Sequence, residues 1–338
     1  MNTMRLIPSS RSLARVLCNV ALAGAVALSA IAQPTPAMQP GQPPGGPGGG
    51  GARGVGRGPV APIVVGPAAT VPAAVAIPRP TDAEIAQANR ALSKFLSSDS
   101  TAEALVAKYP GLIAVQAPRA NFAATYTQTQ QRMGARHEGF VERAKQGNID
   151  LLFNGDSITD FWGTTGKAVF DKNFGAMKVA NFAISGDRTE GLLWGLKNGE
   201  GQGFSPKTIM LMIGTNNTGT GNSPALQAAT SPEIAEGVGA VVMEMRKDFP
   251  NAKILLLAIF PRGADPTDAN RQKNEAANKL IAKLHDGQHV FFMDIGPKFL
   301  GAGGTLAREI MPDLLHPSEK GYEIWAAAVK DKLAELMK

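Results

Sequence analysis

The 338-residue sequence predicts an α/β fold, a three-layer α/β/α sandwich with a five-stranded, mostly parallel sheet, preceded by an extra helical segment. Two observations support this prediction. Short apolar runs alternate with helical patterns through the C-terminal part of the chain, which is typical of a parallel sheet covered by helices on both faces. This alternating part also spans about 190 residues, which is within the usual size of a domain with a single core.

The five strands are predicted from apolar runs that end at turn-forming residues. They lie at residues 149–154, 177–183, 208–213, 253–260 and 290–295. Each run is short enough for a buried strand and too short for a buried helix. The helical patterns of the same region cover residues 189–196, 231–247, 270–284 and 318–337. We therefore expect residues 149–338 to form one α/β domain.

Residues 81–148 are predicted to form a helical N-terminal extension. Thr81 followed three residues later by Glu84 indicates a capping box at the start of a helix. Helical patterns cover residues 81–96, 101–109 and 128–146. The first two helices are a cap, an extra layer or a tether, and the sequence does not distinguish these roles.

Residues 1–32 have the layout of a cleavable signal peptide. Three arginines precede an apolar stretch that begins at Val16 and ends in the small-residue pattern Ala30-Ile31-Ala32. That order predicts export and cleavage, so that the protein is periplasmic or secreted. The apolar stretch is short and contains Asn19, which argues against a permanent membrane span. We expect no stable membrane span after the signal is cleaved.

Cys18 is the only cysteine of the sequence and lies inside this predicted signal. A lipid attachment site is disfavoured, because the preceding Leu17 is bulky where a lipoprotein signal requires a small residue. The exported protein therefore has no cysteine and forms no disulfide. Its stability must come from a packed core.

Residues 33–80 are predicted to be a disordered Pro/Gly-rich linker, because such a composition buries too little apolar surface to offset the entropy of ordering. Residues 1–80 contain six arginines and no Lys, Asp or Glu, which accounts for the whole net charge of +6. Residues 81–338 are thus net neutral (+6 minus 6). The basic character belongs to the tail, and we expect no nucleic-acid partner.

Polar motifs follow the predicted strands. Gly155-Asp156-Ser157 follows the first strand, Ser185-Gly186-Asp187-Arg188 the second and Gly214-Thr215-Asn216-Asn217 the third, and Asp313-Leu314-Leu315-His316 precedes the last helix. The carboxyl ends of parallel strands meet at one edge of the sheet, where sites of open α/β folds collect. A serine, a histidine and a carboxylate brought together there are the components of a serine hydrolase.

These motifs, in this order, resemble the SGNH (GDSL-type) hydrolase superfamily. They are similar to the subgroup that contains the catalytic subunits of platelet-activating-factor acetylhydrolase, as are residues 193–200, Pro261-Arg262-Gly263 and residues 271–274. The resemblance covers residues from about 150 to the C-terminus and implies a flavodoxin-like SGNH fold for residues 149–338. It also implies that two copies of the chain can pair as a homodimer.

The resemblance implies a role for each site residue. Ser157 would be the nucleophile, His316 the general base and acid, and Asp313 the carboxylate that orients the histidine. The oxyanion hole would consist of the backbone N–H groups of Ser157 and Gly186 and the side-chain amide of Asn216. Asp187 and Arg188 either shape the pocket or pair with each other.

The function implied is hydrolysis of short-chain esters, above all acetyl esters on carbohydrates, through an acyl-enzyme intermediate. The alternatives are a lipase, arylesterase or thioesterase of broader specificity and a non-catalytic carbohydrate-binding relative. The sequence contains no Gly-x-Ser-x-Gly elbow, which disfavours the ordinary α/β-hydrolase fold. Its four histidines are scattered and form no metal-binding motif. We predict no metal and no organic cofactor.

Overall fold

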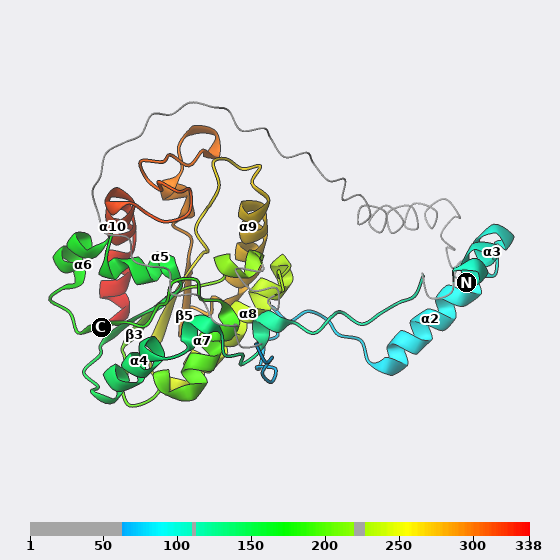
Figure 1. The fold of residues 1–338 in the computed structure, drawn as a ribbon, viewed down its shortest axis with the longest axis horizontal. Helices are drawn as coiled ribbons and strands as arrows, with labels where there is room; N and C mark the ends of the chain where they lie inside the picture. The colour runs from blue at the N-terminus through cyan, green and yellow to red at the C-terminus, as the bar shows by residue number, and fades with distance from the viewer. Residues whose placement is uncertain (1–62, 110–112, 220–226) are drawn as a thin grey trace, which may run out of the picture. The chain divides into compact units, whose positions relative to one another are not determined.

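A computed structural model describes residues 63–109, 113–219 and 227–338 (Figure 1). The predicted signal peptide and most of the predicted linker lie outside the described residues. Among the residues that are described, no helix is both long and apolar enough to cross a membrane.

The centre of the domain is a sheet of five strands. They are β1 (Leu151–Gly155), β2 (Val179–Asn181), β3 (Thr208–Met212), β4 (Lys253–Leu257) and β5 (Val290–Met293). The order across the sheet is β2-β1-β3-β4-β5, and each neighbouring pair is parallel. All five predicted strands are thereby confirmed. In the register of the central pairs, Phe153 lies opposite Asn181 on one side and Met210 on the other.

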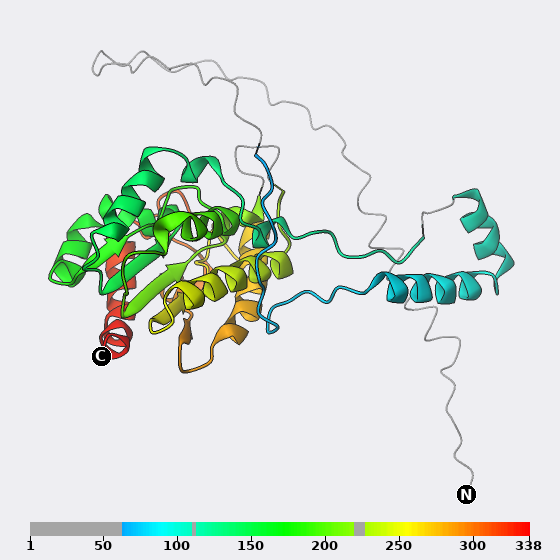
Figure 2. The ribbon, with the colours of Figure 1, turned by 90° about the horizontal axis from the view of Figure 1, so that it is seen from below.

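Helices cover both faces of this sheet, so the predicted three-layer α/β/α sandwich is confirmed (Figures 1 and 2). One face packs against α4 (Ala135–Lys145), α7 (Thr189–Gly195), α8 (Ser231–Asp248) and α9 (Ala269–Ile281). The other packs against α5 (Ser157–Asp160), α6 (Lys167–Phe174) and α10 (Glu319–Leu336). The short helices α5 and α6 were not predicted.

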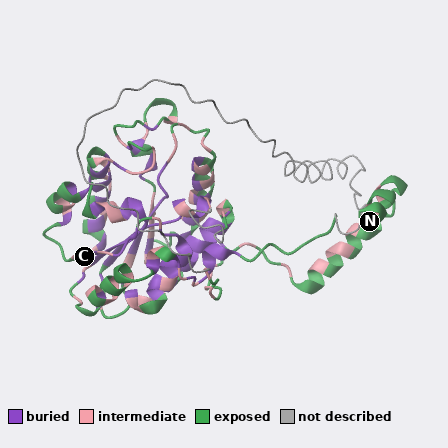
Figure 3. Cartoon of the chain, viewed as in Figure 1, coloured by how far each residue is buried: buried purple, intermediate pink, exposed green. Residues whose placement is uncertain are grey.

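The core on each face is built from alternate residues of the strands. Leu151 and Phe153 of β1 face α10 and pack in a cluster that contains Trp162 and Trp325. Leu152 points to the opposite face and packs among residues of α7 and α8. The central strands β1, β3 and β4 and the inner sides of the helices are accordingly buried, whereas the edge strands β2 and β5 are partly exposed (Figure 3). Each large apolar side chain buried in this way contributes about 1.5–3 kcal/mol to folding.

The N-terminal extension begins with two of the three predicted helices. Helix α2 (Asp82–Leu96) starts at Thr81, whose hydroxyl accepts a hydrogen bond from the N–H of Glu84 while the Glu84 carboxylate accepts from the Thr81 N–H. The predicted capping box is thus present. Helix α3 (Ser100–Lys108) follows and contacts α2.

The third predicted helix, over residues 128–146, is shorter than expected. A 3₁₀ helix η2 (Gln130–Arg132) is separated from α4 by Gly134, which has a φ of +70°. A left-handed residue interrupts the helical hydrogen-bond ladder, and glycine adopts this conformation without steric cost.

Residues 66–79 differ from the predicted disordered linker. Ala68 pairs with Thr125 in an antiparallel bridge, and the N–H of Ala69 donates to the carbonyl of Ala124 at 2.8 Å. Val75 is 6% exposed and packs in the α8 side of the core. The prolines of this stretch exclude regular helix but not an extended path along a surface, and the apolar residues among them pack against the domain.

Residues 121–148 also belong to the packed domain, although the sequence placed its start at residue 149. Ala123 and Ala124 lie in the core beside α8, and the side chain of Arg132 is fully buried. The packed core thus begins before the first strand, and the sequence did not show this because residues 121–134 contain no regular strand or long helix.

We expect a truncation that starts at residue 81 to be less stable than one that starts at residue 63. The shorter chain loses the pairing with residues 124–126 and the burial of Val75, and it removes Arg79, which pairs at 2.7 Å with the buried carboxylate of Glu236. The expected loss is on the order of 2–4 kcal/mol. Urea unfolding of the two proteins measures it, and Val75→Ala in the longer chain isolates the apolar contribution. Equal stabilities would show that residues 63–80 do not help to hold the domain together.

Candidate active site

Ser157 lies at the first turn after β1. The backbone at Gly155 passes so close to β3 that a Cβ there would clash with the carbonyl oxygen of Met212, which requires glycine at this position. Asp156 caps α5 by accepting a hydrogen bond from the N–H of Ile158 at 3.0 Å. The tight turn and the cap together place Ser157 at the first position of α5, where it is 6% exposed.

His316 lies between Ser157 and Asp313. Its Nε2 is 2.8 Å from the Ser157 Oγ, and its Nδ1 is 2.6 Å from the Asp313 Oδ2. The other oxygen of Asp313 accepts hydrogen bonds from the N–H groups of Leu315 and His316, at 3.0 and 2.8 Å. The three residues predicted as a triad are therefore within hydrogen-bond distance in the order Ser157, His316, Asp313.

The loop that carries His316 is fixed from both ends. Leu314 has a φ of +63° and its carbonyl accepts from the N–H of Gly263, which joins this loop to the segment after β4. On the other side, Tyr322 of α10 donates its buried hydroxyl to the carbonyl of Ile158 at 2.7 Å. The ring of Phe161 lies 5.0 Å from the His316 ring. These contacts hold the imidazole beside the start of α5.

The Asp313 carboxylate is 55% exposed at its side chain, so solvent reaches it. Burial alone would raise the pKa of Asp313, but the hydrogen bonds from the His316 ring and from two backbone N–H groups lower it overall. The carboxylate thus stays ionised at pH values at which an ordinary aspartate takes up a proton. It therefore remains an acceptor for the Nδ1 proton of His316 in weakly acidic solution.

The three predicted oxyanion donors come from neighbouring loops. The N–H of Ile184, in the segment after β2, donates to the carbonyl of Gly155 at 3.2 Å. The side-chain amide of Asn216, in the loop after β3, donates to the carbonyl of Asp187 at 2.9 Å. These bonds tie the loops carrying Ser157, Gly186 and Asn216 into one surface. Within the described residues the N–H of Gly186 has no hydrogen-bond acceptor.

Gly186 has a φ of +78°, which disfavours any residue with a side chain. A Cβ at this position would also lie 3.3 Å from the amide nitrogen of Gln131. The end of the Gln131 side chain therefore borders the loop with the predicted donor. The sequence did not point to Gln131, because nothing in residues 128–146 signals a contact with a loop more than 50 residues away.

Asp187 and Arg188 do not pair with each other. Asp187 accepts a hydrogen bond from Arg132 at 2.8 Å, and both side chains are fully buried. Arg188 pairs with Glu190 and donates to the carbonyls of Asn216 and Gln227 at 2.8 and 2.7 Å. Of the two roles left open for these residues, shaping the loops next to Ser157 is the one that the contacts favour.

Two buried carboxyl groups lie beneath the site. Burial raises the pKa of Asp156 to about 7, with nearby Asp187 adding to the rise and the Ile158 N–H and Arg262 opposing it. Burial raises the pKa of Asp187 to about 6 even though Arg132 opposes the rise. One Asp156 oxygen and one Asp187 oxygen have no hydrogen-bond partner among the described residues. Both groups are therefore poorly solvated in their ionised forms.

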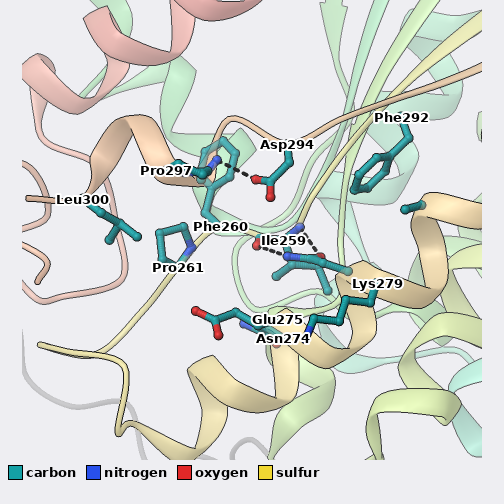
Figure 4. A pocket seen from close by; sticks show the side chains of 13 residues that line it. Ile259, Phe260, Pro261, Asn274, Glu275, Lys279, Phe292, Asp294, Pro297 and Leu300 are labelled. Atoms are coloured by element: carbon teal, nitrogen blue, oxygen red, sulfur yellow. Dashed lines mark hydrogen bonds between the residues drawn. The ribbon is translucent and has the colours of Figure 1, made fainter. Parts of the chain in front are cut away.

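A cavity of about 390 Å³ lies at the same edge of the sheet, after β4 and β5 (Figure 4). Phe260, Pro261 and Phe292 form its apolar walls, and Glu275 and Asp294 line it with carboxylates. None of the predicted catalytic or oxyanion residues lines this cavity. Asn274, which lines this cavity, donates to the hydroxyl of Thr215, next to Asn216, at 3.1 Å.

The raised pKa of Asp156 predicts a pH-dependent stability. The native protein holds a proton on Asp156 that the unfolded chain releases near pH 4, so this stabilisation is complete below pH 4 and is lost as the pH rises to about 7. Asp156→Asn stays neutral and can still cap α5. Between pH 4 and 7, the unfolding free energy of this variant should therefore fall less than that of the wild type, by about 4 kcal/mol at most.

Urea unfolding at several pH values measures this effect. Asp171→Asn, which changes an exposed aspartate of α6, should keep the wild-type profile. An Asp156→Asn profile as steep as that of the wild type would show that Asp156 does not titrate in this range.

The chain was compared with known families and proteins. The sequence model of the GDSL-like Lipase/Acylhydrolase family matches residues 153–324, which is just over half of the chain. The chain is 34% identical over 201 residues to the alpha2 subunit of platelet-activating factor acetylhydrolase IB from Gallus gallus, covering 59% of this chain and 82% of the relative. It is 31% identical over 202 residues to the human alpha1 subunit, covering 60% and 82%.

Two solved structures are also similar. A GDSL-like lipase from Bacteroides thetaiotaomicron superposes with a TM-score of 0.47 at 18% identity, covering 59% of this chain and 97% of that one. A catalytic mutant of an acetylxylan esterase from Geobacillus stearothermophilus gives 0.44 at 18% identity, covering 56% and 94%. The family match and the sequence identity to the two acetylhydrolase subunits show that the chain belongs to the GDSL-like lipase/acylhydrolase family and hydrolyses carboxylic esters.

Proposed function

We propose that the protein is an exported serine esterase that removes short acyl groups, acetyl above all, from acetylated carbohydrates. The observation that carries the catalytic part is the position of His316, with one ring nitrogen 2.8 Å from the Ser157 hydroxyl and the other 2.6 Å from the Asp313 carboxylate. A hydroxyl, an imidazole and a carboxylate in this order form a nucleophile, its base and the group that orients the base.

In the proposed mechanism, the Ser157 Oγ attacks the ester carbonyl carbon while its proton passes to the Nε2 of His316. Asp313 accepts the Nδ1–H and stabilises the imidazolium that forms. When the tetrahedral intermediate collapses, the C–O bond to the alcohol breaks and His316 returns the proton to the leaving oxygen. Water, deprotonated by His316, then attacks the acyl carbon. The bond to the Ser157 Oγ breaks, His316 returns the proton to this oxygen, and the carboxylic acid is released.

The negative oxygen of each tetrahedral intermediate would bind the N–H groups of Ser157 and Gly186 and the amide of Asn216. The Ser157 N–H is at the first position of a helix, where no preceding turn supplies an acceptor. The Gly186 N–H is free within the described residues. Asn216 gives one amide hydrogen to the Asp187 carbonyl, and the second remains for the substrate.

The preference for acetyl has two supports. The relatives that share about a third of their residues with this chain are named acetylhydrolases. In addition, Gln131 borders Gly186 and the Phe161 ring lies against His316, which leaves side chains close to the reacting atoms on two sides. A small acyl group needs the least space there. A carbohydrate as the alcohol part follows from the predicted export, because an exported esterase encounters acetylated glycans.

We expect hydrolysis of p-nitrophenyl esters to fall steeply beyond butyryl and to vanish in Ser157→Ala. The chain from residue 63 onward is the suitable protein, since residues 66–79 pack on the domain. Initial rates from acetyl to octanoyl give the profile of kcat/KM. Full activity in Ser157→Ala would refute the site, and a maximum at octanoyl or longer would favour the lipase alternative. A folded protein inactive on every ester would favour the non-catalytic carbohydrate-binding alternative.

Export and pairing are also part of the proposal. From the signal-peptide pattern we expect the mature chain to begin after Ala32. We also expect it to form a homodimer, as the resemblance to acetylhydrolase subunits implies. N-terminal sequencing of the protein recovered from outside the cytoplasm checks the first point, and sedimentation velocity checks the second. A retained N-terminal segment or a monomeric mass would contradict the corresponding expectation.

A further inference from the structure

The most unusual group outside the proposed triad is Arg132. It lies in η2, outside the segment matched by the family model, and its guanidinium is fully buried. It donates from Nε to the Asp187 carboxylate at 2.8 Å and from a terminal nitrogen to the Glu200 carboxylate. A second terminal nitrogen lies 3.3 Å from the carbonyl of Phe182, in the segment after β2. One cation thus binds two buried carboxylates and the chain leading to Gly186.

Asp187 connects Arg132 to the two oxyanion donors outside α5. It follows Gly186 directly in the chain, so the position of its side chain constrains the orientation of the Gly186 N–H. Its N–H donates to the carbonyl of Ile184 at 3.0 Å, which closes the turn around Gly186. Its own carbonyl accepts from the amide of Asn216 at 2.9 Å. Moving Asp187 would therefore displace two donors at once.

Arg132 is the one cation among the groups that act on the Asp187 carboxylate, and the backbone N–H of Arg188 is the other group that favours its ionised form. The charged groups around it are Arg132 from η2, Glu200 from the π-helical turn η4 (Leu196–Glu200) and Asp156 from the turn after β1. Both neighbouring carboxylates repel it, and His137 contacts the far oxygen of Glu200 at 2.8 Å without reaching Asp187. One Asp187 oxygen already has no partner among the described residues. A buried carboxylate that loses its only cation takes up a proton or moves.

We propose that Arg132 is a positioning residue for ester hydrolysis, which holds Asp187 so that the Gly186 N–H and the Asn216 amide point at the tetrahedral intermediate. This inference rests on the proposed function, because it assumes that these two groups are the oxyanion donors. It assigns residues 121–145 a part in the reaction, since they carry Arg132 into the core and place Gln131 beside Gly186.

The test compares variants of the chain from residue 63 in p-nitrophenyl acetate hydrolysis. Arg132→Met should lower kcat about 10- to 100-fold with KM changed less than about threefold, because the donors act on the transition state. Arg132→Lys keeps the positive charge but lacks the planar set of N–H donors of a guanidinium, and its kcat should lie between those of Arg132→Met and the wild type. Arg79→Met removes another arginine that ties an N-terminal segment to a buried carboxylate, away from Asp187, and should keep the wild-type kcat.

A double variant separates positioning from general damage. Asn216→Ala removes one donor directly, for which a loss of about 10²–10³ in kcat is typical. Because Arg132 acts through that donor as well as through the Gly186 N–H, the combined loss of Arg132→Met and Asn216→Ala should be smaller than the product of the two single losses. Losses that multiply, or an Arg132→Met protein with a kcat within twofold of wild type, would overturn the proposal.

Removing Arg132 alone leaves two buried carboxylates without their cation, so Arg132→Met can fail to fold. The triple variant Arg132→Met, Asp187→Asn, Glu200→Gln removes all three charges and keeps the shape of the site. A folded triple variant with reduced kcat and unchanged KM supports the proposal, and one with wild-type kcat overturns it.

A third measurement reports on the site without substrate turnover. Diethyl p-nitrophenyl phosphate phosphorylates an activated serine, and the new phosphoryl oxygen occupies the oxyanion hole. The rate at which this reagent phosphorylates Ser157 should be lower in Arg132→Met than in the wild type, by about the same factor as kcat. If Ser157 of the wild type is not phosphorylated and the Ser157→Ala variant keeps its activity, the proposed function fails. If Ser157 reacts and Arg132→Met reacts equally fast, only the present inference fails.

Discussion

All five strands run in the same direction, so every loop that follows a strand emerges at one edge of the sheet. The strand order reverses between β1 and β3, which is where open α/β folds place their sites. Ser157 follows β1 and Asn216 follows β3, on the two sides of this reversal, and Gly186 follows the neighbouring β2. The site therefore depends on the pairing of β1 with β2 and β3, which in turn depends on the buried apolar faces of these strands.

The second requirement of the site is the control of buried charge. The turn after β1 and the loop after β2 each place an aspartate in the interior, and burial raises the pKa of both. Arg132 supplies the cation for one of them from a segment far earlier in the chain. A fully apolar replacement of such a cluster often stabilises a protein, so a retained buried ion cluster is weak evidence for stability. The proposed positioning role of Arg132 follows instead from its place beside the loops that carry Gly186 and Asn216.

The carboxylate of the proposed triad presents the opposite situation. Asp313 is half exposed, and its ionised form is held by the His316 ring and by two backbone N–H groups. Because these donors belong to the same short loop, Asp313 and His316 form a local unit that α10 and the Phe161 ring hold against Ser157. Water at Asp313 weakens its electrostatic effect on the imidazole but leaves its orienting hydrogen bond in place.

The sequence alone determined the strands, the order of the motifs and the three residues Ser157, Asp313 and His316 that the fold brings together. It could do so because each strand is a short apolar run and because Asp313 and His316 are only three residues apart, so their contact is local. The fold class followed from the same alternation, which is a property of neighbouring residues along the chain.

Only the tertiary structure decided the role of residues 66–79 and 121–132. Their contacts join them to residues more than 50 positions away, as Arg132 does with Asp187 and Arg79 with Glu236. Irregular backbone has no period, and an ion pair between distant residues leaves no pattern in either segment. Local spacing and the resemblance of the ordered motifs therefore pointed to the proposed catalytic groups, whereas the contacts around them became visible only once the chain was folded.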